Sequence, residues 1–87
     1  MSKYKSINII KAISNENRVK LIFCLSKPQS VTDLLNKCDL SQSALSQHLK
    51  ILKNTGVAVC KKEGKQQIYS VNNPKILSLV NLLLTIK

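Results

Sequence analysis

The sequence predicts a mainly α-helical fold that carries one small β-hairpin (α+β), in the order ααααββα. Apolar residues recur every three or four positions through much of residues 3–54, as they do along one face of a helix. Residues 57–71 form two short stretches on either side of Gly64, which is typical of a hairpin. Asn73 and Pro74 then open a last apolar segment, where proline suits the first position of a helix. The 87 residues are expected to form one domain, 1–87.

The first helix is expected over about residues 3–13 and the second from residue 14 or 15 to the residues before Pro28. The first helix has apolar residues at helical spacing: Tyr4, Ile7, Ile10 and Ile13. Either Ser14 or Asn15 caps the second helix, since both residue types are favoured caps. Proline disfavours helix at the preceding residue, so the second helix ends before Lys27.

A helix-turn-helix is expected over residues 30–54. Ser30 caps the third helix, with Asp33 at the capping-box position. Residues 39–40 make the turn, Ser41 caps the fourth helix, and Gly56 stops it. The inward-facing side chains of the fourth helix are Leu45, Leu49 and Leu52, joined by Ala44 or His48.

The outer face of the fourth helix carries short polar side chains in place of the Glu and Lys of an ordinary solvated helix. Gln and Ser can hydrogen-bond base edges in a major groove, and Lys neutralises phosphates. The side chains expected to approach bases are Gln42, Ser43, Ser46 and Gln47. Those expected at the DNA backbone are Ser41, His48, Lys50 and Lys53. His48 could also pack against the third helix, and its being the only histidine gives no support to catalysis or a metal site.

The hairpin is expected over residues 57–71, with its turn at 63–65. Three lysines crowd its tip: Lys61, Lys62 and Lys65. We expect them to reach the DNA backbone or minor groove, although a solvated hairpin tip would carry lysines as well. A hairpin that directly follows a helix-turn-helix gives the winged helix-turn-helix arrangement of double-stranded DNA-binding proteins.

The last helix, within residues 73–87, has apolar side chains on too many faces for a small monomer to cover. Asn72 or Asn73 caps it, and eight of the eleven residues from 76 to 86 are apolar. A two-fold subunit interface shared with the first helix (within residues 1–26) is the simplest explanation, while a central core helix of a monomer is the alternative. The expected interface residues are Tyr4, Ile7, Ile10, Ile76, Leu79, Val80, Leu83 and Ile86.

Composition favours a polyanionic partner and a reducing compartment. Fourteen Lys and Arg oppose four Asp and Glu, a formal charge of +10, although a coding bias towards Lys contributes. No signal peptide or bilayer-spanning segment is expected, and three cysteines without CxxC spacing argue against a disulfide framework. A cytoplasmic protein that is not an enzyme and does not act at a membrane is therefore expected.

The chain resembles the ArsR/SmtB family of small dimeric winged-helix repressors over about residues 8–72. The residues that carry the resemblance are 12–18 (AISNENR), 41–49 (SQSALSQHL), 56–58 (GVA), 62–66 (KEGKQ) and Tyr69. The resemblance implies a homodimer built from the first and last helices. It also implies repression by operator binding, often relieved by a metal or a thiol-reactive signal.

The sensor sites of the family do not match this chain. One class of metal sensors has two thiolates at the positions where this chain has Ser30 and Thr32. Another class has Asp, His and Glu ligands on the last helix, and the last helix of this chain contains none of these residue types. Redox-responsive members pair a cysteine of the second helix with one of the last helix. Here Phe23 occupies the first of these positions and the last helix has no cysteine. Cys24, Cys38 and Cys60 are expected to be inert, no metal or cofactor is expected, and the inducer stays unknown.

The expected function is a homodimeric repressor that presents two recognition helices to an inverted-repeat operator. Two alternatives remain open. One is a winged-helix protein-interaction module that heterodimerises with or antagonises another regulator. The other is a non-specific DNA-coating protein, which the charge favours and the ordered Ser and Gln face disfavours.

Overall fold

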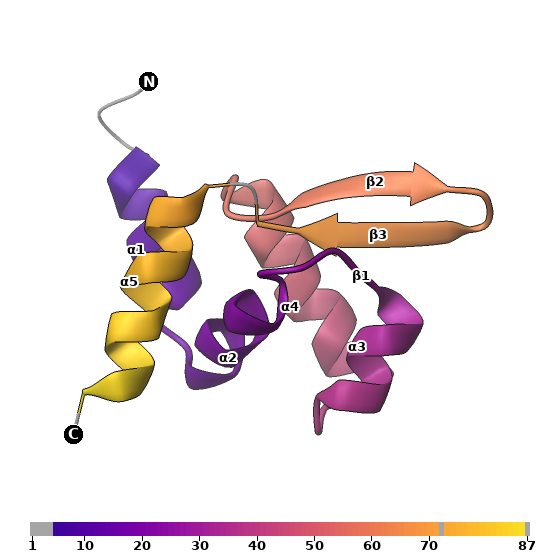
Figure 1. Ribbon diagram of the computed structural model, residues 1–87, viewed down its shortest axis with the longest axis horizontal. Coiled ribbons are helices and arrows are strands. Elements are labelled where there is room, and N and C mark those ends of the chain that lie inside the picture. Colours follow the sequence, from indigo (N-terminus) through magenta and orange to yellow (C-terminus); the bar gives the residue numbers. More distant parts are fainter. Residues whose placement is uncertain (1–4, 72, 87) are drawn as a thin grey trace.

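The computed structural model describes residues 5–71 and 73–86, with side chains from residue 8 onward. Tyr4, the side chain of Ile7 and the possible cap Asn72 lie outside this part. The elements are α1 (Lys5–Ile13), α2 (Glu16–Cys24), β1 (Gln29–Ser30), α3 (Val31–Lys37), α4 (Gln42–Asn54), β2 (Val59–Glu63), β3 (Gln66–Ser70) and α5 (Pro74–Thr85). The predicted fold class and order of elements are confirmed, with the short strand β1 in addition (Figure 1).

Side-chain caps define the first three helix boundaries. The Ser14 hydroxyl donates to the Lys11 carbonyl at 2.8 Å, at the end of α1. Asn15 begins α2, because its Oδ1 accepts from the backbone N–H of Asn17 at 2.9 Å and of Arg18 at 3.2 Å. Ser30 and Asp33 form the predicted capping box of α3, with both reciprocal hydrogen bonds present.

The helix-turn-helix consists of α3 and α4, and α4 ends at a left-handed glycine. Gly56 has φ +81°, a conformation that L side chains rarely adopt. Its N–H donates to the Lys53 carbonyl, and the Val57 N–H donates to the Leu52 carbonyl at 3.0 Å. This Schellman pattern satisfies carbonyls at the helix end and turns the chain towards the hairpin.

The three strands form an antiparallel sheet in the order β1-β3-β2. β2 and β3 are the predicted hairpin, closed by the two residues Gly64 and Lys65. Gly64 has φ +62° and Lys65 does not have a positive φ, which matches a type II′ turn. The strand that was not predicted, β1, pairs Ser30 with Ile68 and so attaches the base of the hairpin to the start of α3.

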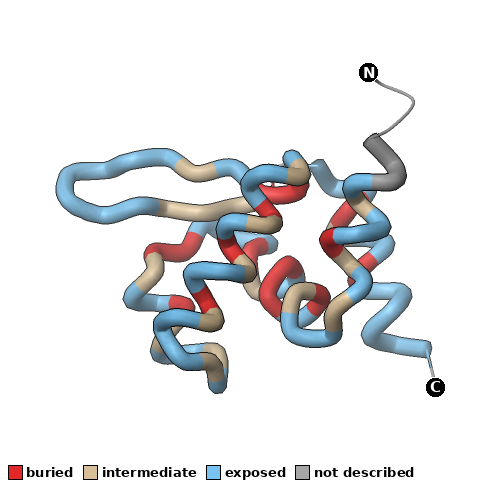
Figure 2. Tube along the Cα trace, turned by 180° about the vertical axis from the view of Figure 1, so that it is seen from behind, coloured by how far each residue is buried: buried red, intermediate tan, exposed pale blue. Residues whose placement is uncertain are grey.

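The core lies where α2, α3, α4 and α5 meet, and Figure 2 shows buried segments at this centre and an exposed hairpin tip. Its largest fully buried side chains are Leu21, Ile22, Leu25, Leu34, Leu45, Leu52, Val57 and Val80. α1 and α5 both pack on α2, at the end of the molecule opposite the hairpin (Figure 1). The Val71 N–H donates to the Leu25 carbonyl at 3.1 Å, which holds the chain in place just before α5.

Two residues predicted for the subunit interface belong to the core of the chain itself. Val80 is 0% exposed and Ile76 is 6% exposed. They face inward because α5 packs on α2, so they have almost no surface left for a second chain.

Candidate DNA-binding surface

Helix α4 holds its polar face outward because its apolar stripe is fixed in the core. Leu45, Leu49 and Leu52 are buried, as predicted from their spacing. Ser41 caps the helix, with its hydroxyl oxygen accepting the Ala44 N–H at 3.1 Å. The cap and the buried stripe together fix the rotation of the helix about its axis, and therefore the direction of every outer side chain.

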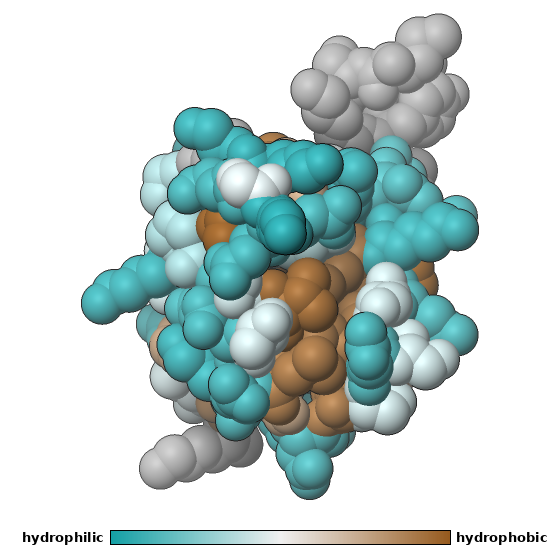
Figure 3. All heavy atoms as spheres, turned by 90° about the vertical axis from the view of Figure 1, so that its right-hand side faces the viewer, coloured by the Kyte–Doolittle hydropathy of each residue, from teal (hydrophilic) through white to brown (hydrophobic). Residues whose placement is uncertain are grey.

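The side chains predicted to contact DNA from α4 are exposed, with one exception. The exposed residues are Ser41, Gln42, Ser43, Ser46, Gln47, Lys50 and Lys53. The exception is His48, which is half-buried. No Asp or Glu occurs between residues 40 and 62, so no carboxylate on α4 repels phosphates. Viewed from the hairpin end, hydrophilic side chains cover much of the molecule around a central apolar area (Figure 3).

Two grooves connect α4 and α3 to the hairpin. One, of about 320 Å³, lies between α4 and β3 and is lined by Val31, Ser46, Leu49, Lys50, Lys53, Asn54, Gln67 and Tyr69. The other, of about 370 Å³, lies between the start of α3 and the hairpin and is lined by Ser30, Val31, Thr32, Lys62, Lys65, Gln66 and Gln67. Gln67 and Val31 line both grooves, so the polar face of α4 reaches the wing at Gln67, beside apolar wall from Val31 and Leu49.

The three wing lysines do not act as one cluster. Lys62 and Lys65 line the groove beside α3. Lys61 neighbours Lys62 on β2, and successive strand residues point to opposite faces, so Lys61 faces away from this groove. All three are exposed. Glu63 is the one carboxylate near them along the hairpin.

Gln67, Tyr69 and Thr32 belong to these grooves and were not among the predicted contact residues. The Tyr69 hydroxyl donates to the Gln67 amide oxygen at 3.4 Å, and burial followed by the neighbouring Cys60 raises the pKa of Tyr69. The spacing of Gln67 and Tyr69, two apart on one strand, places them on the same face. The sequence spacing could therefore have placed Gln67 and Tyr69 on one face of β3, but it could not have shown that this face meets α4.

His48 is half-buried, and its surroundings disfavour its positive charge. Burial, followed by the positive charge of Arg18, lowers the pKa of His48 below its usual value. Its Nδ1 is buried and has no hydrogen-bond partner within the described part of the chain. Arg18 is itself fixed, because its Nε donates to the Ala12 carbonyl at 2.8 Å and its guanidinium also reaches the Lys11 carbonyl at 3.1 Å. His48 thus lies on the α2 side of α4 and not on its outer face.

The four other predicted interface residues whose side chains the structure describes lie on the surface. Ile10 is 61% exposed and Ile86 is 71% exposed, with Leu79 and Leu83 also exposed. Leu82 and Leu84, which were not predicted, join them as exposed residues of α5. Among the residues described, no helix is long and apolar enough to cross a membrane, and no three His, Cys, Asp or Glu side chains gather in a metal-binding arrangement.

A family model described as "Bacterial regulatory protein, arsR family" matches residues 15–58, from the cap of α2 to the residue before β2. The Vibrio cholerae transcriptional activator HlyU is 34% identical over 80 residues, which cover 91% of this chain and 74% of HlyU. The chain belongs to the ArsR family. Family membership makes it a DNA-binding transcriptional regulator.

Other ArsR-family relatives and solved structures agree with this assignment. A Staphylococcus aureus homolog of the cadmium resistance regulatory protein CadC is 38% identical over 83% of this chain, which spans only 61% of that relative. The crystal structure of the Bacillus anthracis repressor PagR superposes with a TM-score of 0.84, at 30% identity over 95% of this chain and 97% of PagR. HlyU from Vibrio cholerae gives a TM-score of 0.82 at 32% identity, over 94% of this chain and 90% of HlyU. HlyU is named as an activator and PagR as a repressor, so related chains differ in the direction of control.

Proposed function

We propose that this chain is a cytoplasmic homodimeric repressor that binds an inverted-repeat operator in double-stranded DNA. One observation carries the proposal: the exposed polar face of α4 has no carboxylate and continues through Gln67 into the lysine-bearing wing. A surface of this composition suits base edges in a major groove flanked by phosphates. The net charge of +10 supports the same partner.

Each group on this surface has a proposed role. Gln42, Ser43, Ser46 and Gln47 approach base edges, while Ser41, Lys50 and Lys53 hold phosphates next to the recognition helix. Lys62 and Lys65 contact the DNA backbone beside the groove, and Lys61 does so from the other face of the hairpin. Because His48 is half-buried beside α2 and its pKa is lowered, its proposed role is to position α4 against α2 and not to hold a phosphate.

The homodimer is proposed to form through the exposed apolar side chains of α1 and α5. These are Ile10, Leu79, Leu82, Leu83, Leu84 and Ile86. Several large apolar side chains exposed on one helix and its neighbour are unfavourable in water and are typical of a protein–protein contact. The two helices lie at the end of the molecule opposite the wing, so pairing there leaves both wings free (Figure 1).

Two copies that meet through α1 and α5 are proposed to present their recognition helices to half-sites one helical turn apart, which recur about every 34 Å on one face of B-DNA. Repression would be steric, by covering a promoter.

Selection of DNA from a random pool with the purified, reduced, metal-free protein tests this proposal. Enrichment of an inverted repeat with half-sites one turn apart is the expected result. A pool that stays random, with affinity that does not depend on sequence, would refute operator binding and favour a DNA-coating protein. Sedimentation of the free protein separates the remaining alternative, since a monomer that dimerises only with another regulator would be an interaction module.

A further inference from the structure

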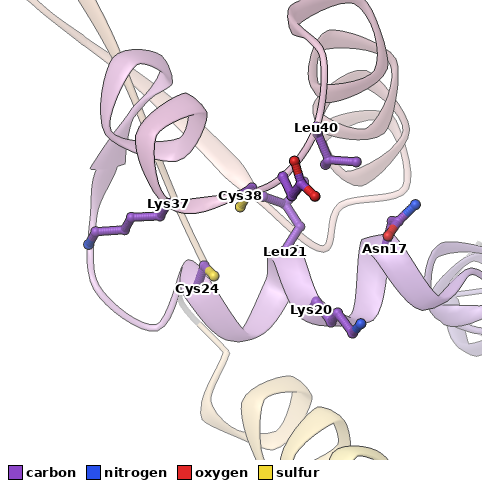
Figure 4. Close-up of a pocket in the computed structure, with 8 residues that line it drawn as sticks. Asn17, Lys20, Leu21, Cys24, Lys37, Cys38 and Leu40 are labelled. Carbon is purple, nitrogen blue, oxygen red and sulfur yellow. The ribbon is translucent and has the colours of Figure 1, made fainter.

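Cys24 and Cys38 line the same surface pocket, although 13 residues separate them in the sequence (Figure 4). Cys24 is the last residue of α2, and Cys38 follows α3 as its C-terminal cap. The pocket has a volume of about 410 Å³. Both thiols are free and half-buried, whereas Cys60 lies on the hairpin and does not line this pocket.

The side chains of Cys24 and Cys38 come from different elements and meet at one pocket that is open to solvent (Figure 4). The fold therefore brings two oxidisable sulfur atoms to the same site. In agreement with this placement, burial, followed by the neighbouring Cys24, raises the pKa of Cys38, and nearby Lys37 opposes this effect only in part.

The rest of the pocket suits a small anionic molecule. Leu21 and Leu40 supply apolar wall, and the charged lining residues are Lys20, Lys37 and Asp39. The Lys37 side chain extends away from the two cysteines, so Lys20 is the cation that can reach a molecule bound beside them (Figure 4). The Lys20 ammonium pairs with Glu16 at 2.9 Å on the surface, and the Lys37 ammonium donates to the Gln29 amide oxygen at 3.1 Å. An exposed pair of this kind is weak, so Lys20 can turn to a bound anion. The volume falls within the range of small-molecule sites.

We propose that Cys24 and Cys38 form a dithiol site that exchanges with a small anionic disulfide of the glutathione class and closes to an intramolecular disulfide. The Cys24 thiolate attacks one sulfur of the small disulfide. A protein mixed disulfide forms, and one small thiol leaves. The Cys38 sulfur, after losing its proton to solvent, then attacks the Cys24 sulfur and expels the second small thiol. Two protein thiols are oxidised, and one disulfide is reduced to two thiols.

The order of the two attacks follows from the surroundings of Cys38. A thiol whose pKa is raised holds less thiolate at neutral pH and is the poorer first nucleophile. Once Cys24 carries the mixed disulfide, Cys38 is already beside the sulfur that it must attack, and proximity compensates for its low thiolate fraction. This pair is distinct from a pairing of the second and last helices, for which the chain has no cysteine in α5.

The bond would join the end of α2 to the segment that leads into the recognition helix. Cys38 has extended backbone angles, φ −102° and ψ 140°, and only residues 39 and 40 separate it from the Ser41 cap of α4. A disulfide here would link the element that supports α1 and α5 with the loop before the recognition helix. The site is therefore placed to transmit a redox change to the proposed DNA-binding surface.

The test is the exchange of the full-length, reduced protein with oxidised glutathione, followed by intact mass and peptide mapping. Wild type is expected to lose two hydrogen atoms and to show a Cys24–Cys38 bond within one chain. The Cys60→Ser protein is the matched control and should behave in the same way. The Cys38→Ser protein should instead retain a glutathione adduct on Cys24, because nothing resolves it. The Cys24→Ser protein should form no cross-link between residues 24 and 38.

A comparison of folded with denatured wild-type protein makes the test independent of any variant. In denaturant, the Cys24–Cys38 and Cys38–Cys60 bonds should form in yields within about two-fold, since the two loops differ little in length. In the folded protein, the Cys24–Cys38 bond should exceed the other by more than about ten-fold. Equal yields in both conditions, or persistent glutathione adducts on Cys24 of folded wild type, would overturn the proposal.

Discussion

At the scale of single residues, Gln47 offers the sharpest test of base recognition. Replacing Gln47 with Ala should weaken binding to the selected operator by about 5- to 150-fold, the equivalent of about 1–3 kcal/mol for one good side-chain–base contact. Binding to unrelated DNA should stay unchanged. Competitive titrations on the two DNAs at one salt concentration measure both affinities.

The control for Gln47 is Asn36→Ala, which removes an exposed amide on α3 that lines neither groove. Its effect on both DNAs should be small. An equal loss on operator and unrelated DNA with Gln47→Ala would show that the residue does not recognise bases.

His48 predicts a pH dependence of stability. Its pKa is lowered in the folded chain, so at pH values near and below the usual histidine pKa of about 6.5 the unfolded chain binds more protons than the folded chain. The stability that comes from keeping His48 neutral is complete above that pH, and it is lost as the pH falls through the lowered, folded-state value. Denaturant unfolding between about pH 7.5 and pH 5 should show this loss, and His48→Gln should reduce it. The same pH dependence in the variant would assign the loss to other groups.

At the scale of elements, Ser41 should contribute to stability through its cap as well as to DNA binding, whereas the outer face of α4 should contribute to DNA binding alone. Ser41→Ala removes the oxygen that accepts the Ala44 N–H and should lower the free energy of unfolding by about 1 kcal/mol. Ser43→Ala changes an exposed serine of the same helix that the structure gives no capping bond. It should leave stability unchanged and weaken operator binding. Thermal or urea unfolding of the two variants separates these effects.

The wing should contribute through phosphate contacts. The double variant Lys62→Ala, Lys65→Ala should reduce the slope of log affinity against log salt by about 2, because each phosphate contact contributes about 0.9. The matched variant Lys20→Ala, Lys27→Ala removes the same charge from the region of α2, away from both grooves. It should change the slope less. If the slopes of the two double variants are equal, the wing does not contact DNA.

Most elements could be predicted because their signals are local. Ser30 and Asp33, Ser41, and Gly56 are caps or stops that act within a few residues of themselves, and each has the predicted role. The strand β1 could not be predicted, because two residues have no periodicity and its partner, β3, lies far along the chain. Gln67 and Tyr69 were missed for a similar reason, since only tertiary packing brings that face of β3 to α4.

The last helix shows the limit of periodicity at the element scale. With apolar residues on several faces, the sequence of α5 does not say which face meets α2. Packing places Ile76 and Val80 there and leaves Leu82 and Leu84 on the surface. The meeting of Cys24 and Cys38 at one pocket likewise depends on tertiary packing, because their spacing in the sequence does not predict that they lie near each other.

At the scale of the whole molecule, the surface of α5 predicts a dimer that can be dissociated without unfolding the subunit. The double variant Leu82→Glu, Ile86→Glu changes two exposed positions and should sediment as a folded monomer with much weaker operator binding. Val59→Glu changes an exposed apolar residue on the hairpin and should leave the dimer intact. Sedimentation and circular dichroism measure mass and folding together. A variant that remains dimeric would place the interface elsewhere.

Ser30 has two structural roles, and together they limit how the wing can change. It pairs with Ile68 in the sheet and caps α3, so a change at this position would disturb the wing and the helix-turn-helix together. Towards its tip, beyond Gln67, the hairpin is exposed on both strands. Inserting residues into both strands would change the reach of the wing without moving the recognition helix. Two residues in each strand would keep the side chains beyond the insertion on their original faces, whereas one residue in each strand would reverse those faces. The junction at Ser30 therefore constrains the base of the wing and not its length.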